Sequence, residues 1–291
     1  MTIRKKIYLL YQKVIRVFSG HGIGKIPIIR DIHKFINFNL RPRFVKIGKN
    51  KMFLDPNDTI VSKNLATRGV YEPIETEIVK KEIKRGDIVL DIGANIGYYT
   101  LIFSELVGEN GKVFAFEPDP DNFALLNKNV QINNCHNVVL IKKGVSNKSG
   151  MAKLYLSEKN KGDHRTYDLL DGRKSIEIEI IQLDDYFKDY KGKIDFIKID
   201  IQGAELNAFY GMRNIFKKNQ NMKILTEFWP EGLKNSGANP AEYLQFFTEH
   251  GFKMYDVCGK TGRMKSIGAS ELLKTYIYEK QIETNLLCIM Q

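Results

Sequence analysis

Hydrophobic positions follow a regular alternating rhythm over most of this chain, beginning near residue 75. Short apolar runs predict strands, and apolar residues recurring at helical spacing predict helices between them. Strands are expected at 87–93, 112–118, 137–146, 193–200, 222–228, 252–257 and 284–290, and helices at 75–84, 98–107, 121–133, 203–216 and 240–251. Strands that alternate with helices indicate a mostly parallel sheet of seven strands with helices on both faces.

The rhythm changes between residues 146 and 190. The segments 151–157 and 175–185 both alternate apolar and polar residues, and a long polar loop, "EKNKGDHRTYDLLDGRK", separates them. This pattern predicts a β-hairpin insertion that carries a loop long enough to be functional.

An amphipathic, basic helix is expected at residues 3–18, with Ile7, Leu10, Tyr11, Val14, Ile15 and Phe18 on one stripe. It either lies on an anionic membrane surface or docks on the protein with a solvated basic face. Glycines at 20, 22 and 24 end it, and the irregular stretch that follows suggests an N-terminal helical lobe over 1–70 ahead of a main domain over 71–291.

Charge and composition indicate which partners and which cellular compartment to expect. The formal net charge is +11, so an acidic partner is expected, which is nucleic acid, an anionic membrane or an anionic substrate. The three cysteines form no metal-ligand or disulfide pattern, and no run of about eighteen apolar residues occurs. A cytoplasmic protein is expected, with peripheral contact at the inner face of the membrane through residues 3–18 as an open alternative.

The stretch "VLDIGANIGYYTLIFSEL" at 89–106 predicts a buried strand, a tight turn and a helix, an arrangement that presents backbone N–H groups to a ligand. A dinucleotide turn begun at Gly93 would need glycines where Asn95 and Tyr98 stand, and no Gly-Lys-Ser/Thr of a P-loop follows. The remaining pattern, D-x-G-x-N-x-G from Asp91 to Gly97, suits S-adenosylmethionine (SAM).

The next strand ends in "AFEP". Glu117 stands where a carboxylate accepts hydrogen bonds from both ribose hydroxyls, which we favour over a role at the N-terminus of the following helix. The cofactor residues expected around the two strand ends are Asp91, Gly93, Ala94, Asn95, Gly97, Tyr98, Glu117, Pro118 and Asn122.

Four segments together resemble the FkbM-type SAM-dependent methyltransferases over about residues 52–230: "GDIVLDIGANIGYYTLIFS", "VFAFEPDPDNFALLNKNV", "LDDYF" and "IDFIKIDIQGAELNAFYG". The resemblance implies a class I methyltransferase fold, which is Rossmann-like, and methyl transfer to a hydroxyl of a sugar, glycan, polyketide or similar metabolite. The upstream "GVYEP" makes Glu72 a candidate cofactor contact. Family members often have Glu where this chain has Gln202.

Methyl transfer from a sulfonium needs alignment and desolvation, and an alcohol acceptor benefits from a base. Asp200 ends the fourth parallel strand and is expected to act as base, to hold the amino group of the cofactor, or to cap a helix. His164, beside Asp163, Arg165 and Tyr167, is a second candidate base.

Glu227 is expected at the rim, where it binds acceptor hydroxyls. Trp229 either stacks on a sugar face or fills the interior. No catalytic metal is expected, and Asp184 and Asp185 are interpreted as helix-capping residues.

Two other functions compete with O-methylation. A nucleic-acid methyltransferase is suggested by the basic charge, but "DIQG" lacks the Asn/Asp-Pro-Pro-aromatic signature, and we expect no nucleic-acid partner. A non-enzymatic peripheral membrane protein would use the helix at 3–18.

Overall fold

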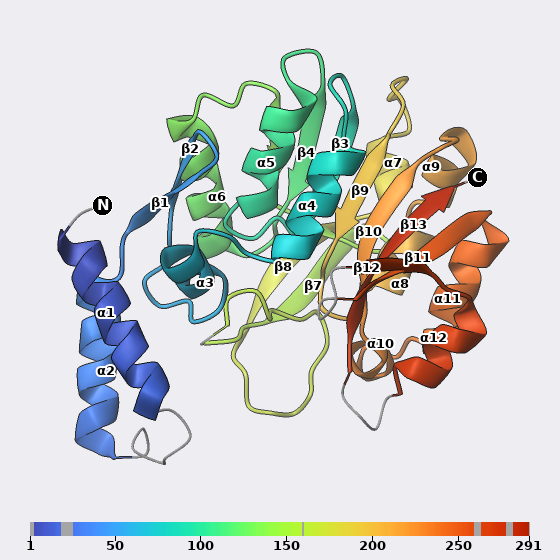
Figure 1. The fold of residues 1–291 in the computed structure, drawn as a ribbon. Coiled ribbons are helices and arrows are strands. Elements are labelled where there is room, and N and C mark those ends of the chain that lie inside the picture. The colour runs from blue at the N-terminus through green and yellow to red at the C-terminus, as the bar shows by residue number, and fades with distance from the viewer. Residues whose placement is uncertain (1–2, 19–25, 159, 259–262, 278–281, 291) are drawn as a thin grey trace.

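The computed structural model describes residues 3–18, 26–158, 160–258, 263–277 and 282–290, which form a central sheet covered by helices, with a helical pair at one side (Figure 1). The sheet has eight strands in the order β12-β11-β13-β10-β9-β3-β4-β5. Strands β10, β9, β3, β4 and β5 are mutually parallel, and β13 pairs antiparallel with β10 and β11. The bounds are β3 Ile88–Ile92, β4 Lys112–Phe116, β5 Val138–Ile141, β9 Phe196–Ile199, β10 Lys223–Phe228, β11 Phe252–Cys258, β12 Arg263–Ser266 and β13 Thr284–Met290.

Each of the seven strands expected from the sequence has a counterpart in this sheet, although the one expected at 137–146 ends at Ile141, and the α/β class is confirmed. The eighth strand, β12, was not expected. Its sequence, RMKS, has only one apolar residue, and it pairs with β11 alone at the edge of the sheet. A short polar edge strand carries no hydrophobic pattern from which to predict it.

Helices cover both faces because strand residues alternate between two cores. Val89 of β3 packs in one hydrophobic cluster with residues of α4 and α5, and Leu90 packs in another with residues of α8, α9 and α11. The helices of the sheet domain are α3 Val61–Arg68, α4 Pro73–Glu82, α5 Tyr98–Val107, α6 Pro120–Ile132, α7 Leu183–Tyr186, α8 Glu205–Tyr210, α9 Arg213–Lys218, α10 Pro230–Asn235, α11 Pro240–Glu249 and α12 Ala269–Thr275.

One expected helix is in fact two. The stretch 203–216 breaks into α8 and α9 around Gly211, where an added Cβ would lie 2.1 Å from the carbonyl oxygen of Ser146. The backbone of Ser146 therefore packs directly against the chain at Gly211, and only glycine fits at this contact.

The insertion is a separate three-stranded sheet of order β6-β8-β7, with β6 Gly144–Val145, β7 Gly150–Tyr155 and β8 Ser175–Ile181. Strands β7 and β8 pair antiparallel, so the predicted hairpin is present, and its connecting loop reaches toward the carboxyl ends of the central strands. This insertion supplies one wall of the site described below.

The first part of the chain contains α1 Ile3–Phe18, α2 Pro27–Leu40 and the hairpin β1 Phe44–Ile47 with β2 Asn50–Phe53. Met52 and Leu65 share a hydrophobic cluster with α4, α5 and the central strands. The boundary at residue 70 stays a prediction, although this shared core joins the two sides of it. Among the described residues, no helix is both long and apolar enough to cross a membrane.

Candidate active site

A cavity opens at the carboxyl ends of β3, β4 and β9, which is where parallel sheets bind ligands. The walls come from the turn after β3, the end of β4, the loop of the insertion and the segment after β9. Eight of the ten residues expected to bind the cofactor line it: Asp91, Gly93, Ala94, Asn95, Tyr98, Glu117, Pro118 and Asn122. Gly97 and Glu72 do not.

The two glycines of the turn, Gly93 and Gly97, are required for different physical reasons. Gly93 has φ +82°, and an added Cβ would lie 2.1 Å from the carbonyl oxygen of Asp200, so this glycine lets β3 and β9 approach each other at the cavity. Gly97 precedes α5 with φ +92°, and its Cβ would lie 2.6 Å from Leu126 Cδ1. Gly97 therefore serves the packing of α5 against α6 rather than lining the cavity.

Asp91 is fully buried at the end of β3. Its Oδ2 accepts a hydrogen bond of 2.5 Å from Thr100 Oγ1, whereas Oδ1 is buried and has no hydrogen-bond partner. Burial raises the pKa of Asp91 to about 6, although the charge of Lys198 acts in the opposite direction. A buried carboxylate oxygen without a partner is costly, so the cavity offers a strong acceptor to a cationic or N–H donor group.

Glu117 ends β4 with both oxygens in use. Oε2 accepts from the backbone N–H of Asn95 at 2.8 Å, and Oε1 accepts from that of Asp119 at 2.9 Å. Burial raises its pKa to about 8. The helix α6 is capped by Asp119, whose Oδ1 accepts from the N–H of Asn122 at 2.8 Å. Glu117 also contacts the start of that helix through the N–H of Asp119, so its role toward the ribose and its role at the helix N-terminus both stay predictions.

Hydrogen bonds to its backbone hold the loop of the insertion over the cavity. The carbonyl oxygen of Lys161 accepts from the side-chain amides of Asn95 at 3.0 Å and Asn122 at 3.1 Å. The backbone N–H of Lys161 donates to Asp58 Oδ1 at 3.2 Å. Asn95 and Asn122 therefore hold the loop as well as lining the cavity, a role that the sequence did not reveal.

His164 lines the same cavity, but its geometry does not fit a base. Nδ1 accepts a hydrogen bond of 2.9 Å from the backbone N–H of Ser157, so the proton of the neutral ring is on Nε2. Nε2 has no hydrogen-bond partner and lies 3.9 Å from Asp119 Oδ2, beside the capping carboxylate of α6. Burial lowers its pKa. His164 is therefore a buried donor on the α6 side of the cavity, away from the carboxylates described next.

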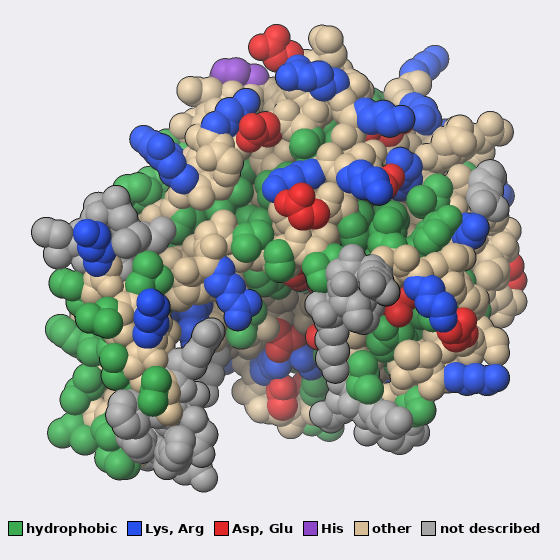
Figure 2. Space-filling model, in the orientation of Figure 1, with side chains coloured by type: hydrophobic (Ala, Val, Ile, Leu, Met, Phe, Trp, Pro, Cys, Tyr) green, Lys and Arg blue, Asp and Glu red, His purple; other side chains and the backbone are tan. Residues whose placement is uncertain are grey.

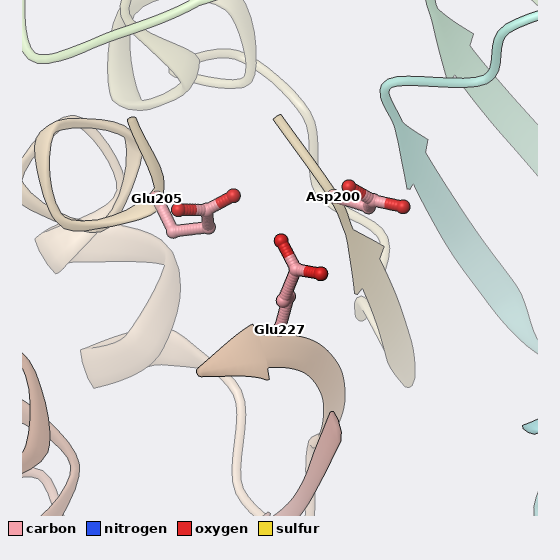
Figure 3. A group of neighbouring side chains, drawn as sticks. All are labelled: Asp200, Glu205 and Glu227. Atoms are coloured by element: carbon pink, nitrogen blue, oxygen red, sulfur yellow. The ribbon is translucent and has the colours of Figure 1, made fainter. Parts of the chain in front are cut away.

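Asp200, Glu205 and Glu227 converge beyond β9 and β10, and one carboxylate oxygen of each lies within 4.8 Å of the others (Figure 3). Asp200 lines the cavity, and its side chain is 28% exposed. Glu205 accepts from the backbone N–H groups of Ile201 and Gly203, and burial raises its pKa to about 7. Burial, followed by the charge of Asp200, raises the pKa of Glu227 well above its usual value. Both glutamates therefore bind a proton more readily than an exposed glutamate does.

Gln202 stands in the middle of this cluster, with φ +56° in the tight turn after β9. Its Nε2 donates to Asp200 Oδ1 at 2.8 Å and faces Glu227 Oε2 at 3.4 Å. An amide at this position links the two carboxylates, whereas a glutamate would add a further negative charge. The departure from the family pattern therefore changes the electrostatics of the site.

Lys198 is a buried cation that the sequence analysis did not single out. Its Nζ lies 3.6 Å from Asp200 Oδ2 and 4.6 Å from the centre of the Tyr99 ring. Burial acts to lower its pKa, but the charges of Asp200, Glu72 and Asp91 outweigh burial and raise it. Glu72 accepts from Tyr99 Oη at 2.9 Å behind this lysine. Glu72 thus belongs to the charge network of the site and not to the cavity wall.

Two further expectations concern residues around the rim. The guanidinium of Arg165 lies 5.0 Å from the ring centre of Trp229 and pairs with Asp163 at 2.7 Å, so the indole already has a stacking partner. Asp184 accepts from the N–H groups of Asn214 and Ile215 at 3.0 Å, as a capping residue of α9 does.

Comparison with known proteins identifies the family. The model of the methyltransferase FkbM domain matches residues 91–254, which is more than half of the chain. The chain belongs to the FkbM methyltransferase family. The expected class I methyltransferase fold and the cofactor, S-adenosylmethionine, are confirmed with it.

Two named methyltransferases and one solved structure are similar to this chain. Methyltransferase sdnD of Sordaria araneosa is 26% identical over 203 residues, covering 55% of this chain and 78% of the relative. Hexuronic acid methyltransferase AglP of Haloferax volcanii is 30% identical over 139 residues, covering 47% of this chain and 54% of AglP. The crystal structure of a methyltransferase FkbM from Methylobacillus flagellatus matches with a TM-score of 0.43 and 14% identity, over 90% of this chain and 59% of the other.

The residues at the cavity fit the chemistry of SAM. The free oxygen of Asp91 is an acceptor for an ammonium or hydroxyl group, and Glu117 retains acceptor capacity beyond its two backbone contacts. The lining places Asp91, Glu117 and Asp200 beside Lys143, Lys161 and Lys198, so carboxylates are available to a cationic sulfonium. This FkbM-family protein is therefore a SAM-dependent methyltransferase whose acceptor is the next question.

Proposed function

We propose that the protein transfers a methyl group from SAM to a hydroxyl of a sugar, a glycan or a similar small metabolite. The observation that carries the proposal is the carboxylate cluster at the wall of the cavity, in which Asp200 and Glu227 are partly exposed, Glu205 is buried, and both glutamates have raised pKa values. SAM supplies the electrophilic methyl group. The residues of this chain supply orientation, a dry surrounding and a proton acceptor.

Each carboxyl group has a distinct part. Asp200 takes the proton of the acceptor hydroxyl, because it is the member that reaches the cavity. Glu227, whose carboxyl group meets that of Asp200 in the cluster, binds an acceptor hydroxyl, and its raised pKa favours the protonated form that donates a hydrogen bond. Glu205 holds the turn after β9 through two backbone N–H groups, and Lys198 offsets part of the negative charge.

A sugar is the favoured acceptor for two reasons. Hydrogen-bonding carboxyl groups at the wall suit a polyhydroxylated molecule, and the relative AglP is named a hexuronic acid methyltransferase. We therefore place uronic acids first among the acceptors to be tested.

The test is methyl transfer from tritiated SAM to a panel of free and nucleotide-linked uronic acids, neutral hexoses and transfer RNA. We expect label in a uronic acid or a hexose, and Asp200→Asn should lower kcat by about 100-fold or more with the affinity for S-adenosylhomocysteine (SAH) unchanged. If Asp200 instead holds the amino group of the cofactor, the same variant loses SAH affinity. Exclusive labelling of RNA would refute the proposal.

A further inference from the structure

The helical pair α1 and α2 exposes apolar side chains in an unusual way. On α1, Ile7, Leu10, Val14 and Val17 are all exposed and recur at helical spacing, so they form one continuous stripe. Leu10 is 64% exposed. A stripe of this kind normally faces a core, but here it faces outward.

The second helix repeats the pattern. Ile28, Ile32, Phe35 and Phe38 of α2 are exposed at helical spacing, and Phe35 is 68% exposed. Figure 2 shows hydrophobic side chains gathered at the lower left of the molecule, over α1 and α2. Two apolar stripes on neighbouring helices make a patch far larger than scattered exposed residues produce.

Polar groups occupy the seam between the two helices. Tyr8 is fully buried, its hydroxyl faces Asn37 Oδ1 at 3.4 Å, and Gln12 Nε2 donates to Asn37 Oδ1 at 3.1 Å. Arg41 Nε donates to the Tyr8 hydroxyl at 3.3 Å. The pair thus has polar groups in its seam, while the aliphatic and aromatic side chains of the two stripes stay in contact with water, which is unfavourable.

Positive charge accompanies the patch. Residues 1–40 contain eight Lys or Arg and one Asp, a formal +7 of the +11 of the whole chain. Lys6 and Lys13 are exposed and, at helical spacing, flank the stripe of α1. They also line a groove between α1 and α3 with Lys63 and Arg68, and none of the described residues lining this groove is acidic.

We propose that the α1–α2 pair seats the protein on an anionic lipid bilayer, with both apolar stripes in the acyl-headgroup boundary and the cationic groove against lipid phosphates. Charge complementarity selects this occupant, since apolar area and basic residues together are what interfacial helices use. The proposal does not depend on the acceptor of the methyltransferase.

The test is flotation of the full chain with vesicles of phosphatidylcholine alone or with an equal part of phosphatidylglycerol. The wild type is expected to float with the anionic vesicles and to release in high salt. The double variant Leu10→Ser and Phe35→Ser should lower the partition coefficient by about tenfold or more, and Lys6→Gln with Lys13→Gln by about tenfold at low salt. Met151→Ser, an exposed apolar residue on β7, is the matched control and should leave partitioning unchanged.

Folding of each variant is checked by its SAH affinity, which the substitutions on α1 and α2 should not alter. Absence of wild-type binding to both vesicles overturns the proposal, as does full binding by the double serine variant. Sedimentation supplies the alternative outcome: a concentration-dependent dimer that the serine variant abolishes, without vesicle binding, would show that the patch joins two copies of this chain.

Discussion

Replacing Asp91 with asparagine should weaken cofactor binding and, at the same time, stabilise the cofactor-free protein. Both effects follow from one buried carboxylate with one unpartnered oxygen. Asparagine keeps the size of the side chain and can still accept from Thr100, but it removes the charge. The loss of a charge-assisted hydrogen bond to the cofactor, about 1.5–3 kcal/mol, predicts SAH affinity lower by roughly 10- to 150-fold.

The gain in stability is set by the pKa of Asp91, which burial raises from 3.8 to about 6. Because the folded pKa lies above the unfolded one, the folded protein binds more protons between these values, and the free energy of unfolding falls as pH rises from about 4 to 6. A shift of this size corresponds to about 3 kcal/mol of destabilisation above pH 6 at 1.36 kcal/mol per unit. Asparagine avoids this cost, although Lys198 loses a partner, so the net gain should be about 1–3 kcal/mol.

Urea unfolding followed by the fluorescence of Trp229, together with SAH titration calorimetry, measures both quantities. The stability difference between wild type and variant should be largest at pH 7.5 and smaller at pH 5, where Asp91 in the wild type is mostly protonated. Asp189→Asn, at an exposed carboxylate that does not line the cavity, should change neither quantity. A variant that is less stable at pH 7.5, or that keeps full SAH affinity, would refute the reasoning.

Three further predictions follow from neighbouring residues. Gly93→Ala should lower the free energy of unfolding by about 2 kcal/mol more than Gly172→Ala, because both glycines have a φ near +80° but only the first faces a carbonyl oxygen at 2.1 Å; equal losses in urea unfolding would contradict this. Asp184→Ala should cost about 1 kcal/mol and leave SAH affinity unchanged, while Asp185→Ala should be nearly neutral, since only Asp184 accepts from the first N–H groups of α9. Gln202→Glu replaces a hydrogen-bond donor to Asp200 with a negative charge. It should therefore shift the acid limb of the activity–pH profile to higher pH by about one unit and lower the activity at neutral pH. An unchanged profile would exclude Asp200 as the base.

The sheet was predictable because its strands are buried on both faces and read as apolar runs between clear helices. What the sequence did not predict has a local physical cause. Strand β12 has no apolar pattern, and the break between α8 and α9 depends on a backbone contact of Gly211 with Ser146, distant in the sequence. Contacts between segments far apart in the chain leave no periodic signal.

The residues of the site also divide into those that the sequence predicts and those that only the structure reveals. Asp91 and Glu117 were placed at the cavity from their positions at strand ends, a rule of parallel sheets. The sequence does not predict a site role for Lys198, because a lysine inside a strand is typical of an exposed position. Only the surrounding carboxylates explain its burial. His164 was a reasonable candidate base by residue type, but the tautomer that the N–H of Ser157 imposes was visible only in three dimensions.

The net charge is explained by its uneven distribution, which also bears on the acceptor. Of the +11, residues 1–40 carry +7, so the remaining 251 residues carry only +4. The lining of the cavity is balanced in formal charge, since Asp91, Glu117 and Asp200 are matched there by Lys143, Lys161 and Lys198. A lining of this kind offers no excess of positive charge to attract a polyanionic nucleic acid, whereas a small hydroxylated acceptor needs none. The basic character of the chain therefore belongs to the α1–α2 pair and to what that pair contacts, and it gives no support to a nucleic-acid acceptor at the cavity.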